Sequence, residues 1–284
     1  MTKGDARPYS SLVRDALDLR GRVAVITGAA GLLGRQHADA IAEMGGTPVL
    51  VDIDLDRASG HAAEISRQFD VQTLALAADI TRPESVDAMC RQVIERLGSV
   101  DILVNNAARN PKVEGGGTGL TRLESFSLSE WRADLEVGLT GAFLCARVLG
   151  KAMAERGRGV ILNIASDLSI LAPDQRLYRK EGLAEDSQPV KPVSYSVVKS
   201  GLLGLTRYLS TYWADRGVRC NALSPGGVFA GQDAVFIDRI GSLIPMGRMA
   251  RPDEYKAAVV FLVSDASSYM NGANVVIDGG RSVW

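Results

Sequence analysis

The chain has 284 residues, of which 46% are hydrophobic and 23% are charged, and its formal net charge is −1. This composition is typical of a globular chain with one large core, and the near-zero charge argues against a general basic surface for nucleic acid. The three cysteines lie far apart and lack CxxC spacing, so the sequence predicts neither a disulfide framework nor a metal site.

The sequence shows neither the apolar run of a membrane span nor the pattern of a signal peptide. No uninterrupted apolar run approaches the roughly 18 residues of a membrane span, and the first residues lack the apolar core of a signal peptide. We therefore expect a cytoplasmic protein that binds a small molecule, with no nucleic-acid partner and no membrane.

Short runs of β-branched residues alternate with longer amphipathic stretches along the chain. A strand over 23–27, a helix over 32–44 and a strand over 48–52 form the first βαβ unit. Because right-handed crossovers between parallel strands place helices on both faces of a sheet, the repeated unit predicts a doubly wound, seven-stranded parallel sheet, the Rossmann fold of α/β proteins. The other five strands are expected at 73–77, 101–105, 160–165, 219–224 and 274–278.

Two regions do not follow this alternation. Residues 1–20 read as an N-terminal extension, and residues 21–284 as a single domain. Within that domain the polar stretch 167–194 is long for a plain connection, and loops of such length are usually functional or disordered. The stretch 167–194, called the insert below, is therefore a candidate functional loop.

A glycine-rich turn, TGAAGLLG, lies at 27–34 between the first strand and the first helix. Gly28, Gly31 and Gly34 allow a sharp turn, bring backbone N–H groups close to a pyrophosphate, and let the helix pack tightly on the sheet. Three glycines alone are weak evidence, but the preceding strand and the following helix supply the expected context. The turn predicts a dinucleotide site.

Acidic residues close the second and third strands. Asp52 follows Gly28 by 24 residues and could accept hydrogen bonds from both ribose hydroxyls while repelling a 2′-phosphate, which favours NAD over NADP. The alternative is a solvated acid, for which Asp54 and Asp56 are competitors. Asp79 could either face the adenine or cap the following helix.

Tyr195 and Lys199 stand four residues apart at the start of a helical pattern, hence on one helical face. A tyrosine pKa of about 10 must fall by roughly two to three units to give a base near neutral pH, and a nearby cation supplies about one to three. Chance also produces such pairs. Ser166 ends the fifth strand, at the sheet edge where doubly wound folds bind ligands, although alone it would suit a cap.

Taken together, these motifs resemble the short-chain dehydrogenase/reductase family, from residue 20 to residue 280. The resemblance implies that Tyr195 is the general acid/base, that Ser166 orients the reacting oxygen, and that Lys199 lowers the tyrosine pKa and holds the nicotinamide ribose. It also implies a homodimer or homotetramer and hydride transfer between a CH–OH group and the cofactor. The pieces that carry it are TGAAGLLG, AADIT, NNAA, NIAS, YSVVK, SPGGV and IDGG.

The resemblance extends to the cofactor contacts. The NNAA segment is expected beside the adenosine half, and the backbone after Pro225 beside the nicotinamide carboxamide. With Tyr195 and Lys199, the implied contacts are Gly28, Gly31, Leu33, Gly34, Asp52, Asp79, Ile80, Asn106, Ala107, Pro225, Gly226 and Val228.

Three features depart from the family pattern. The turn has TGxxGxxG spacing, which resembles the extended, sugar-nucleotide branch, whereas the remaining motifs resemble the compact branch. Gly138 stands where relatives usually carry an asparagine of the catalytic tetrad. The distance from Ser166 to Tyr195 is 29 residues, much longer than in most relatives.

The long insert points to a polar substrate. Asp167, Gln175 and Arg176 are expected to contact it, as are Asn110 and Lys112 from the loop after the fourth strand. A self-balancing charged flap is the alternative for the insert. The segments NPKVE, ASDLSILAPDQRLY and ALSPGGV are similar to oxidoreductases of bacterial surface-sugar and flagellin-modification pathways, which implies a sugar or sugar-phosphate alcohol.

Two other functions stay open. One is a nucleotide-binding sensor or scaffold with weak turnover. Gly138 favours this function, whereas the presence of Ser166, Tyr195 and Lys199 argues against it. The other is a nucleotide-sugar epimerase or dehydratase, which needs a substrate domain after the lysine. Only 85 residues follow Lys199, and they read as the last two strands with their helices.

Overall fold

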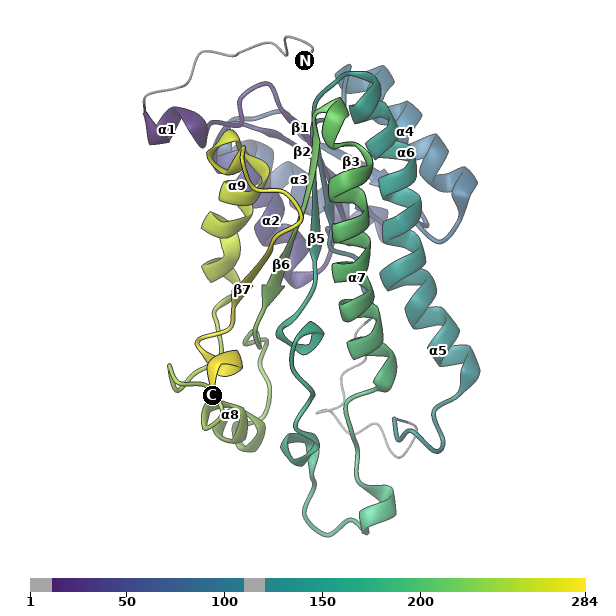
Figure 1. Cartoon of the computed structure of the whole chain (residues 1–284), viewed down its shortest axis with the longest axis vertical. Coiled ribbons are helices and arrows are strands. Elements are labelled where there is room, and N and C mark those ends of the chain that lie inside the picture. Colours follow the sequence, from purple (N-terminus) through teal and green to yellow (C-terminus); the bar gives the residue numbers. More distant parts are fainter. Residues whose placement is uncertain (1–11, 110–120) are drawn as a thin grey trace.

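The computed structural model describes residues 12–109 and 121–284 and contains one parallel sheet of seven strands (Figure 1). The strand order is β3-β2-β1-β4-β5-β6-β7. The chain therefore adds β2 and β3 on one side of β1 and then β4 to β7 on the other side, as in a doubly wound fold. The predicted fold class is confirmed. The strands are β1 Val23–Thr27, β2 Thr47–Asp52, β3 Leu74–Ala77, β4 Ile102–Asn105, β5 Gly159–Ile164, β6 Val218–Pro225 and β7 Asn274–Ile277.

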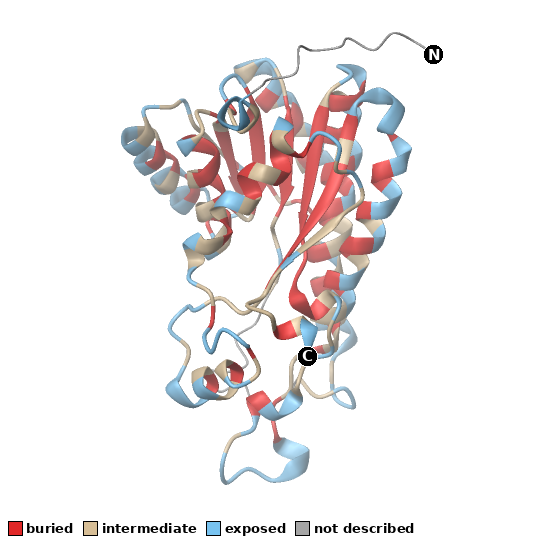
Figure 2. Ribbon diagram, turned by 60° about the vertical axis from the view of Figure 1, so that its left-hand side comes forward, coloured by how far each residue is buried: buried red, intermediate tan, exposed pale blue. Residues whose placement is uncertain are grey.

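The central strands are buried on both faces. All residues of β1, β4 and β5 are buried, which explains why these strands read as continuous apolar runs instead of alternating patterns (Figure 2). The ends of these strands carry the residues that face the site.

Helices cover the sheet in two layers (Figure 1). One layer packs apolar side chains from α2, α3 and α9 on one face, and the other packs α4, α6 and α7 on the opposite face. The first layer is α2 Leu32–Glu43, α3 Leu55–Phe69 and α9 Lys256–Val263, and the second is α4 Pro83–Leu97, α6 Gly141–Glu155 and α7 Val193–Tyr212.

A π-helical turn joins two of the helices. α5 (Leu128–Leu135) runs through Glu136–Thr140 into α6, and the resulting stretch Leu128–Glu155 is long and apolar enough to pass for a membrane span by length and composition. Charged side chains interrupt this stretch, so it does not form an uninterrupted apolar run in the sequence. Because 56% of its most apolar window is buried in the fold, packing accounts for this apolarity.

Buried amide side chains tie the sheet to α7. Asn105 Nδ2 donates to Asn163 Oδ1 at 2.9 Å, and Asn163 Nδ2 donates to Thr206 Oγ1 at 2.8 Å. Thr206 in turn donates to the Leu202 carbonyl at 2.7 Å. This chain of bonds links β4, β5 and the helix that carries Tyr195.

The insert folds as short helical turns below the carboxyl edge of the sheet (Figure 1). Leu177 and Tyr178 are buried and pack against Phe236 and Ile240 of α8 (Ala234–Gly241), with the Tyr178 and Phe236 ring centroids 5.7 Å apart. The insert and α8 therefore form a small apolar cluster that closes one side of the site.

The described part of the N-terminal extension contains a short helix, α1 (Val13–Ala16), and ends on the main core. Leu19 is fully buried, and its N–H donates to the Met44 carbonyl at 2.9 Å. Cys90, Cys145 and Cys220 are free and buried.

Candidate active site

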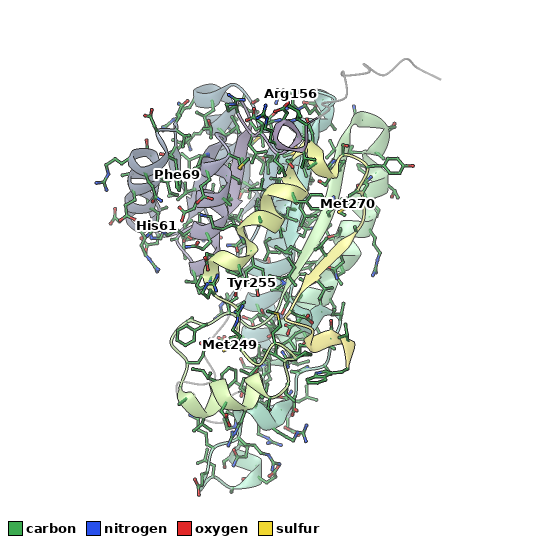
Figure 3. All side chains as sticks on the ribbon, turned by 90° about the vertical axis from the view of Figure 1, so that its left-hand side faces the viewer. His61, Phe69, Arg156, Met249, Tyr255 and Met270 are labelled. Carbon is green, nitrogen blue, oxygen red and sulfur yellow. The ribbon has the colours of Figure 1, made fainter. Side chains whose placement is uncertain are left out.

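A cavity of about 690 Å³ opens at the carboxyl edge of the sheet. Ser166 reaches it from the end of β5, and Tyr195 and Lys199 reach it from the first turns of α7. Met249, which also lines it, lies between Tyr255 and α8 (Figure 3). The predicted site residues in its lining are Leu33, Asn106, Ser166, Asp167, Tyr195, Lys199, Pro225, Gly226 and Val228.

The glycine turn is shaped by close backbone approach. Gly28 has a φ of 65°, and a Cβ there would lie 2.8 Å from the Ala107 Cα. Asn106 Nδ2 donates to the Thr27 and Gly28 carbonyls at 2.9 and 3.1 Å, and the N–H of Ala107 donates to Thr27 Oγ1 at 3.2 Å. The NNAA segment therefore holds the turn in place.

The first turn of α2 begins without a side-chain cap. Its N-cap is Gly31, which has no side chain to accept the leading N–H groups, and Gly34 leaves room for the Gly28 carbonyl. An uncapped N-terminus on a helix of this length is a suitable seat for a pyrophosphate. Leu33, from the same turn, lines the cavity.

Asp52 lies at the end of β2, directly beside the glycine turn. Its Oδ2 accepts from the Ala30 N–H at 2.9 Å, and its Oδ1 accepts from the Asp54 N–H at 3.1 Å. The carboxylate is therefore fixed in orientation by the turn that it would serve, although it does not line the cavity.

Asp79 and Ile80, both predicted to contact the cofactor, do not line the cavity. Asp79 accepts from the Thr81 N–H and hydroxyl at 3.0 and 2.7 Å, and these bonds lower its carboxyl pKa. It also pairs with Arg82 at 3.3 Å, so its side chain closes the turn before α4. Ile80 is buried in the core, with its Cδ1 close to Gly141.

Lys199 is buried at the cavity floor. Its Nζ donates to the Ile164 carbonyl at 2.7 Å and lies 5.8 Å from the Tyr195 ring centroid. Burial lowers the pKa of Lys199 to about 8, and the nearby Lys191 contributes in the same direction.

In the chain alone, the pKa of the Tyr195 phenol is raised and not lowered as the sequence predicted. Burial raises the pKa of Tyr195 to about 12, a hydrogen bond with Ser166 lowers it in part, and the Asp167 charge raises it further. In the chain alone, the expected lowering by Lys199 does not offset the effect of burial on this pKa. The phenol is therefore protonated at neutral pH in this state.

Ser166 lies at the cavity and also caps a turn. Its Oγ lines the cavity and also caps the turn Asp167–Ser169, because it accepts from the Leu168 N–H at 3.2 Å. Its hydroxyl donates to Asp167 Oδ1 at 2.9 Å.

The structure does not bring two of the predicted substrate contacts into the cavity. Gln175 Oε1 accepts from the Lys191 N–H at 2.8 Å, and Arg176 is exposed and pairs with Asp174 at 2.7 Å. Both side chains thus stabilise the insert itself. Asn110 and Lys112 lie outside the described residues.

Several cavity residues were not identified from the sequence. Lys191 is the one with a usable signal, because it stands four residues before Tyr195 in KPVSY. Arg281 lies far away along the chain from the other site residues. Gln232, from the loop after β6, gave no pattern at all.

Gly138 lies buried in the π-helical turn between α5 and α6. A Cβ at this position would collide with Cγ1 of Val198, one residue before Lys199. Val198 therefore fills the space that a larger residue at 138 would need, so the two positions are matched.

In the part of the chain that the structure describes, no group of three or more His, Cys, Asp or Glu side chains is placed to hold a metal ion.

Comparisons with known proteins match this chain over almost its whole length. Residues 22–176 match the family model described as short chain dehydrogenase, and residues 182–282 match the model described as enoyl-(acyl carrier protein) reductase. A D-threitol dehydrogenase from Mycolicibacterium smegmatis is 36% identical, over 93% of this chain and 94% of that protein. An NAD-dependent glycerol dehydrogenase from Listeria innocua is 33% identical, over 94% of this chain and 96% of that protein.

A solved structure shows the same architecture. The gluconate 5-dehydrogenase from Burkholderia cenocepacia, in complex with NADP and tartrate, superposes with a TM-score of 0.84 at 29% identity, over 96% of this chain and all of that chain. The fold, the motifs and these matches agree. The chain belongs to the short-chain dehydrogenase/reductase family of oxidoreductases.

Proposed function

We propose that this chain is an NAD-dependent dehydrogenase that interconverts a secondary alcohol and a ketone in a polyhydroxylated, sugar-like or sugar-phosphate substrate. The observation that carries the proposal is the meeting of Ser166, Tyr195 and Lys199 on one cavity whose wall also holds Lys191 and Arg281. These polar groups suit a ligand with several hydroxyls.

The relatives support an alcohol of this class. Two carry the names of the polyols threitol and glycerol, and the third carries the name of the sugar acid gluconate. The link to surface-sugar and flagellin modification stays a prediction.

The residues present fit a nicotinamide dinucleotide. The uncapped start of α2 would seat the pyrophosphate, and Asp52, held by the Ala30 N–H, would accept from the adenosine ribose. The glycerol dehydrogenase is named as NAD-dependent, whereas the gluconate enzyme holds NADP, so the preference for NAD rests on the Asp52 carboxylate.

The chemistry follows from the three side chains on the cavity. When bound, the nicotinamide ring would take the hydride from the carbinol carbon. Tyr195, as phenolate, accepts the hydroxyl proton, and Ser166 holds the same oxygen in place. Lys199 holds its ammonium in the same cavity through its bond to the Ile164 carbonyl. The positive ring of bound NAD would oppose the effect of burial, which raises the Tyr195 pKa.

The test is an assay of NADH absorbance with purified enzyme, NAD or NADP, and a panel of polyols, sugars and sugar phosphates. We expect NADH to form with at least one member, and a lower rate with NADP. Tight NAD binding with no net reduction across the panel would favour the sensor or the epimerase instead.

A further inference from the structure

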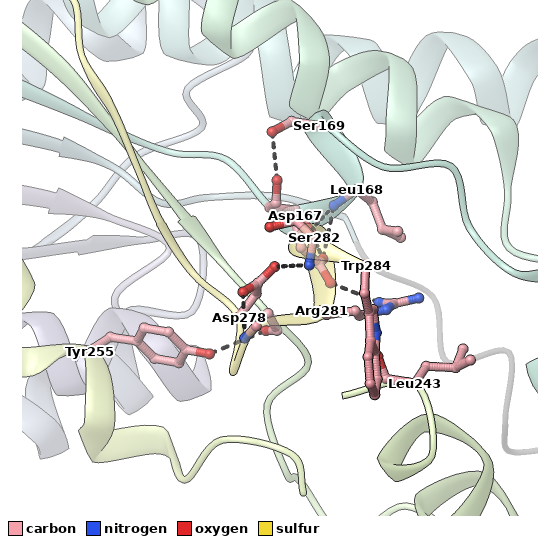
Figure 4. Close-up of polar contacts among 12 residues, drawn as sticks. Asp167, Leu168, Ser169, Leu243, Tyr255, Asp278, Arg281, Ser282 and Trp284 are labelled. Carbon is pink, nitrogen blue, oxygen red and sulfur yellow. Dashed lines mark hydrogen bonds and ion pairs between the residues drawn. The ribbon is translucent and has the colours of Figure 1, made fainter. Parts of the chain in front are cut away.

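A buried ion pair connects the last turn of the chain to the cavity (Figure 4). Arg281 begins the 3-10 turn Arg281–Val283 after β7, and its Nη1 donates to Asp167 Oδ2 at 2.7 Å. The side chains are only 8% and 4% exposed, and both residues line the cavity.

The second oxygen of this carboxylate contacts the serine of the site. Asp167 Oδ1 accepts from the Ser166 hydroxyl at 2.9 Å and from the Leu168 N–H at 2.8 Å. A serine hydroxyl has one proton, so the proton directed to Asp167 is the one that the reacting oxygen would otherwise receive. The charge state around Asp167 therefore decides how firmly that proton is held.

The turn that carries Arg281 is itself fixed. Asp278 accepts from the Gly280 and Ser282 N–H groups at 2.9 and 2.8 Å, and Trp284 Nε1 donates to the Leu243 carbonyl at 3.1 Å. Arg281 thus reaches Asp167 from a rigid base, across 114 residues of sequence.

We propose that Arg281 is a positioning residue for the reaction: by pairing with Asp167 it weakens the hold of that carboxylate on the Ser166 proton and leaves the hydroxyl able to turn to the reacting oxygen. This inference rests on the proposed function. Burying an ion pair is costly, and apolar side chains would fill the same space at least as stably, so a purely structural need does not explain it.

Without Arg281, the buried carboxylate would act on both neighbours. An unpaired anion accepts a hydrogen bond more strongly, which would fix the Ser166 proton away from the cavity. It would also disfavour a phenolate at Tyr195, on which the Asp167 charge already acts in that direction. Among the residues that the structure describes, the ammonium groups of Lys191 and Lys199 also lie near the Tyr195 ring.

Alcohol oxidation needs deprotonated Tyr195, so its rate rises with pH. Arg281→Met should move this rising limb to higher pH by about one unit and lower kcat about tenfold below it, since a neighbouring charge shifts a pKa by about one to three units. Asp167→Asn should move the limb the opposite way.

The variants separate charge from packing. We expect Arg281→Lys to keep most of the wild-type kcat, and the double variant Arg281→Met with Asp167→Asn to return the limb toward its wild-type position, because no charge is then left unpaired. Arg22→Met is the matched control: Arg22 is equally buried and pairs with Asp265 at 2.9 Å, away from the cavity. It should lower stability and leave the limb unmoved.

A second readout does not depend on turnover. Tyrosinate absorbance with bound NAD, taken as the difference from the same variant carrying Tyr195→Phe, should show Tyr195 ionising at higher pH in Arg281→Met. An unshifted limb and titration in a folded Arg281→Met variant, or a double variant no better than the single one, would overturn the inference. A shifted titration in a chain that oxidises no alcohol would uphold it and reject the proposed function.

Discussion

The ammonium of Lys191 lies over the face of the Tyr195 ring, 4.0 Å from its centroid. The backbone at Lys191 is held in place, because its N–H donates to Gln175 Oε1 and Pro192 follows it. The insert thus brings a cation to the wall of the cavity, beside the residue proposed as the base.

Lys191→Met should weaken catalysis. A cation over an aromatic ring in a partly desolvated site is worth about 1 to 2 kcal/mol, so we expect kcat/KM to fall roughly 5- to 30-fold. Steady-state rates with the best alcohol of the panel measure this. Arg176→Met, in the same insert but exposed and paired with Asp174, should leave kcat/KM unchanged, and equal losses in both variants would contradict the geometry.

Tyr195→Phe removes the proposed base without changing the shape of the cavity wall. Because a positioned acid/base contributes about 10² to 10⁴-fold, kcat should fall by that factor while the affinity for NAD stays nearly constant. Stopped assays for product and cofactor fluorescence titrations measure the two quantities. A variant that keeps a tenth of the wild-type rate would place the base elsewhere.

The titration of Tyr195 should depend on the cofactor's charge. Burial raises its pKa to about 12 in the chain alone, so its tyrosinate absorbance, read as wild type minus Tyr195→Phe, should develop only under strongly alkaline conditions. Bound NAD adds a positive ring and should lower this pKa, whereas NADH, whose ring is neutral, should not. Equal titrations with NAD and NADH would show that ring charge does not tune the phenol.

Asp52 should read the adenosine ribose. Asp52→Ala removes the carboxylate that would repel a 2′-phosphate, and we expect the ratio of kcat/KM for NAD over NADP to fall about tenfold or more, equivalent to about 1.4 kcal/mol. Asp52→Asn is the matched variant, because its amide oxygen can still accept from the Ala30 N–H. If neither variant changes the ratio, another residue reads the ribose.

Gly138→Ala should destabilise the fold, because the new Cβ collides with Val198 Cγ1. Overpacking of this kind costs about 1 to 3 kcal/mol, which urea unfolding can measure. Combining it with Val198→Ala should recover part of the loss relative to the sum of the single variants. Additive effects would show that the two positions are not matched.

The sheet was predictable because buried parallel strands have a simple sequence signature. The apolar run at 23–27 and the glycine turn that follows it define strand, turn and helix within a dozen residues. Ser166, Tyr195 and Lys199 meet at one cavity for a related reason: a strand end and a helical i, i+4 pair both fix direction in space.

The substrate wall was less predictable, because polarity alone does not tell which way a side chain points. In the turn Gln175–Tyr178, burial of Leu177 and Tyr178 against α8 leaves Arg176 in solvent. Arg281 reaches the cavity from the far end of the chain, and no local pattern announces such a contact.

The hydrogen bonds from Asn105 to Asn163 and from Asn163 to Thr206 affect the position of Tyr195, although neither bond involves Tyr195. An α-helix turns about 100° per residue, so a slip of α7 by one position would swing Tyr195 off the cavity wall. Such a slip would first break the buried hydrogen bond from the Asn163 side-chain amide to Thr206 Oγ1. The side chains of Asn105, Asn163 and Thr206 therefore fix the register of α7 against the sheet. Substitutions at these positions should slow hydride transfer although none of them contacts the substrate.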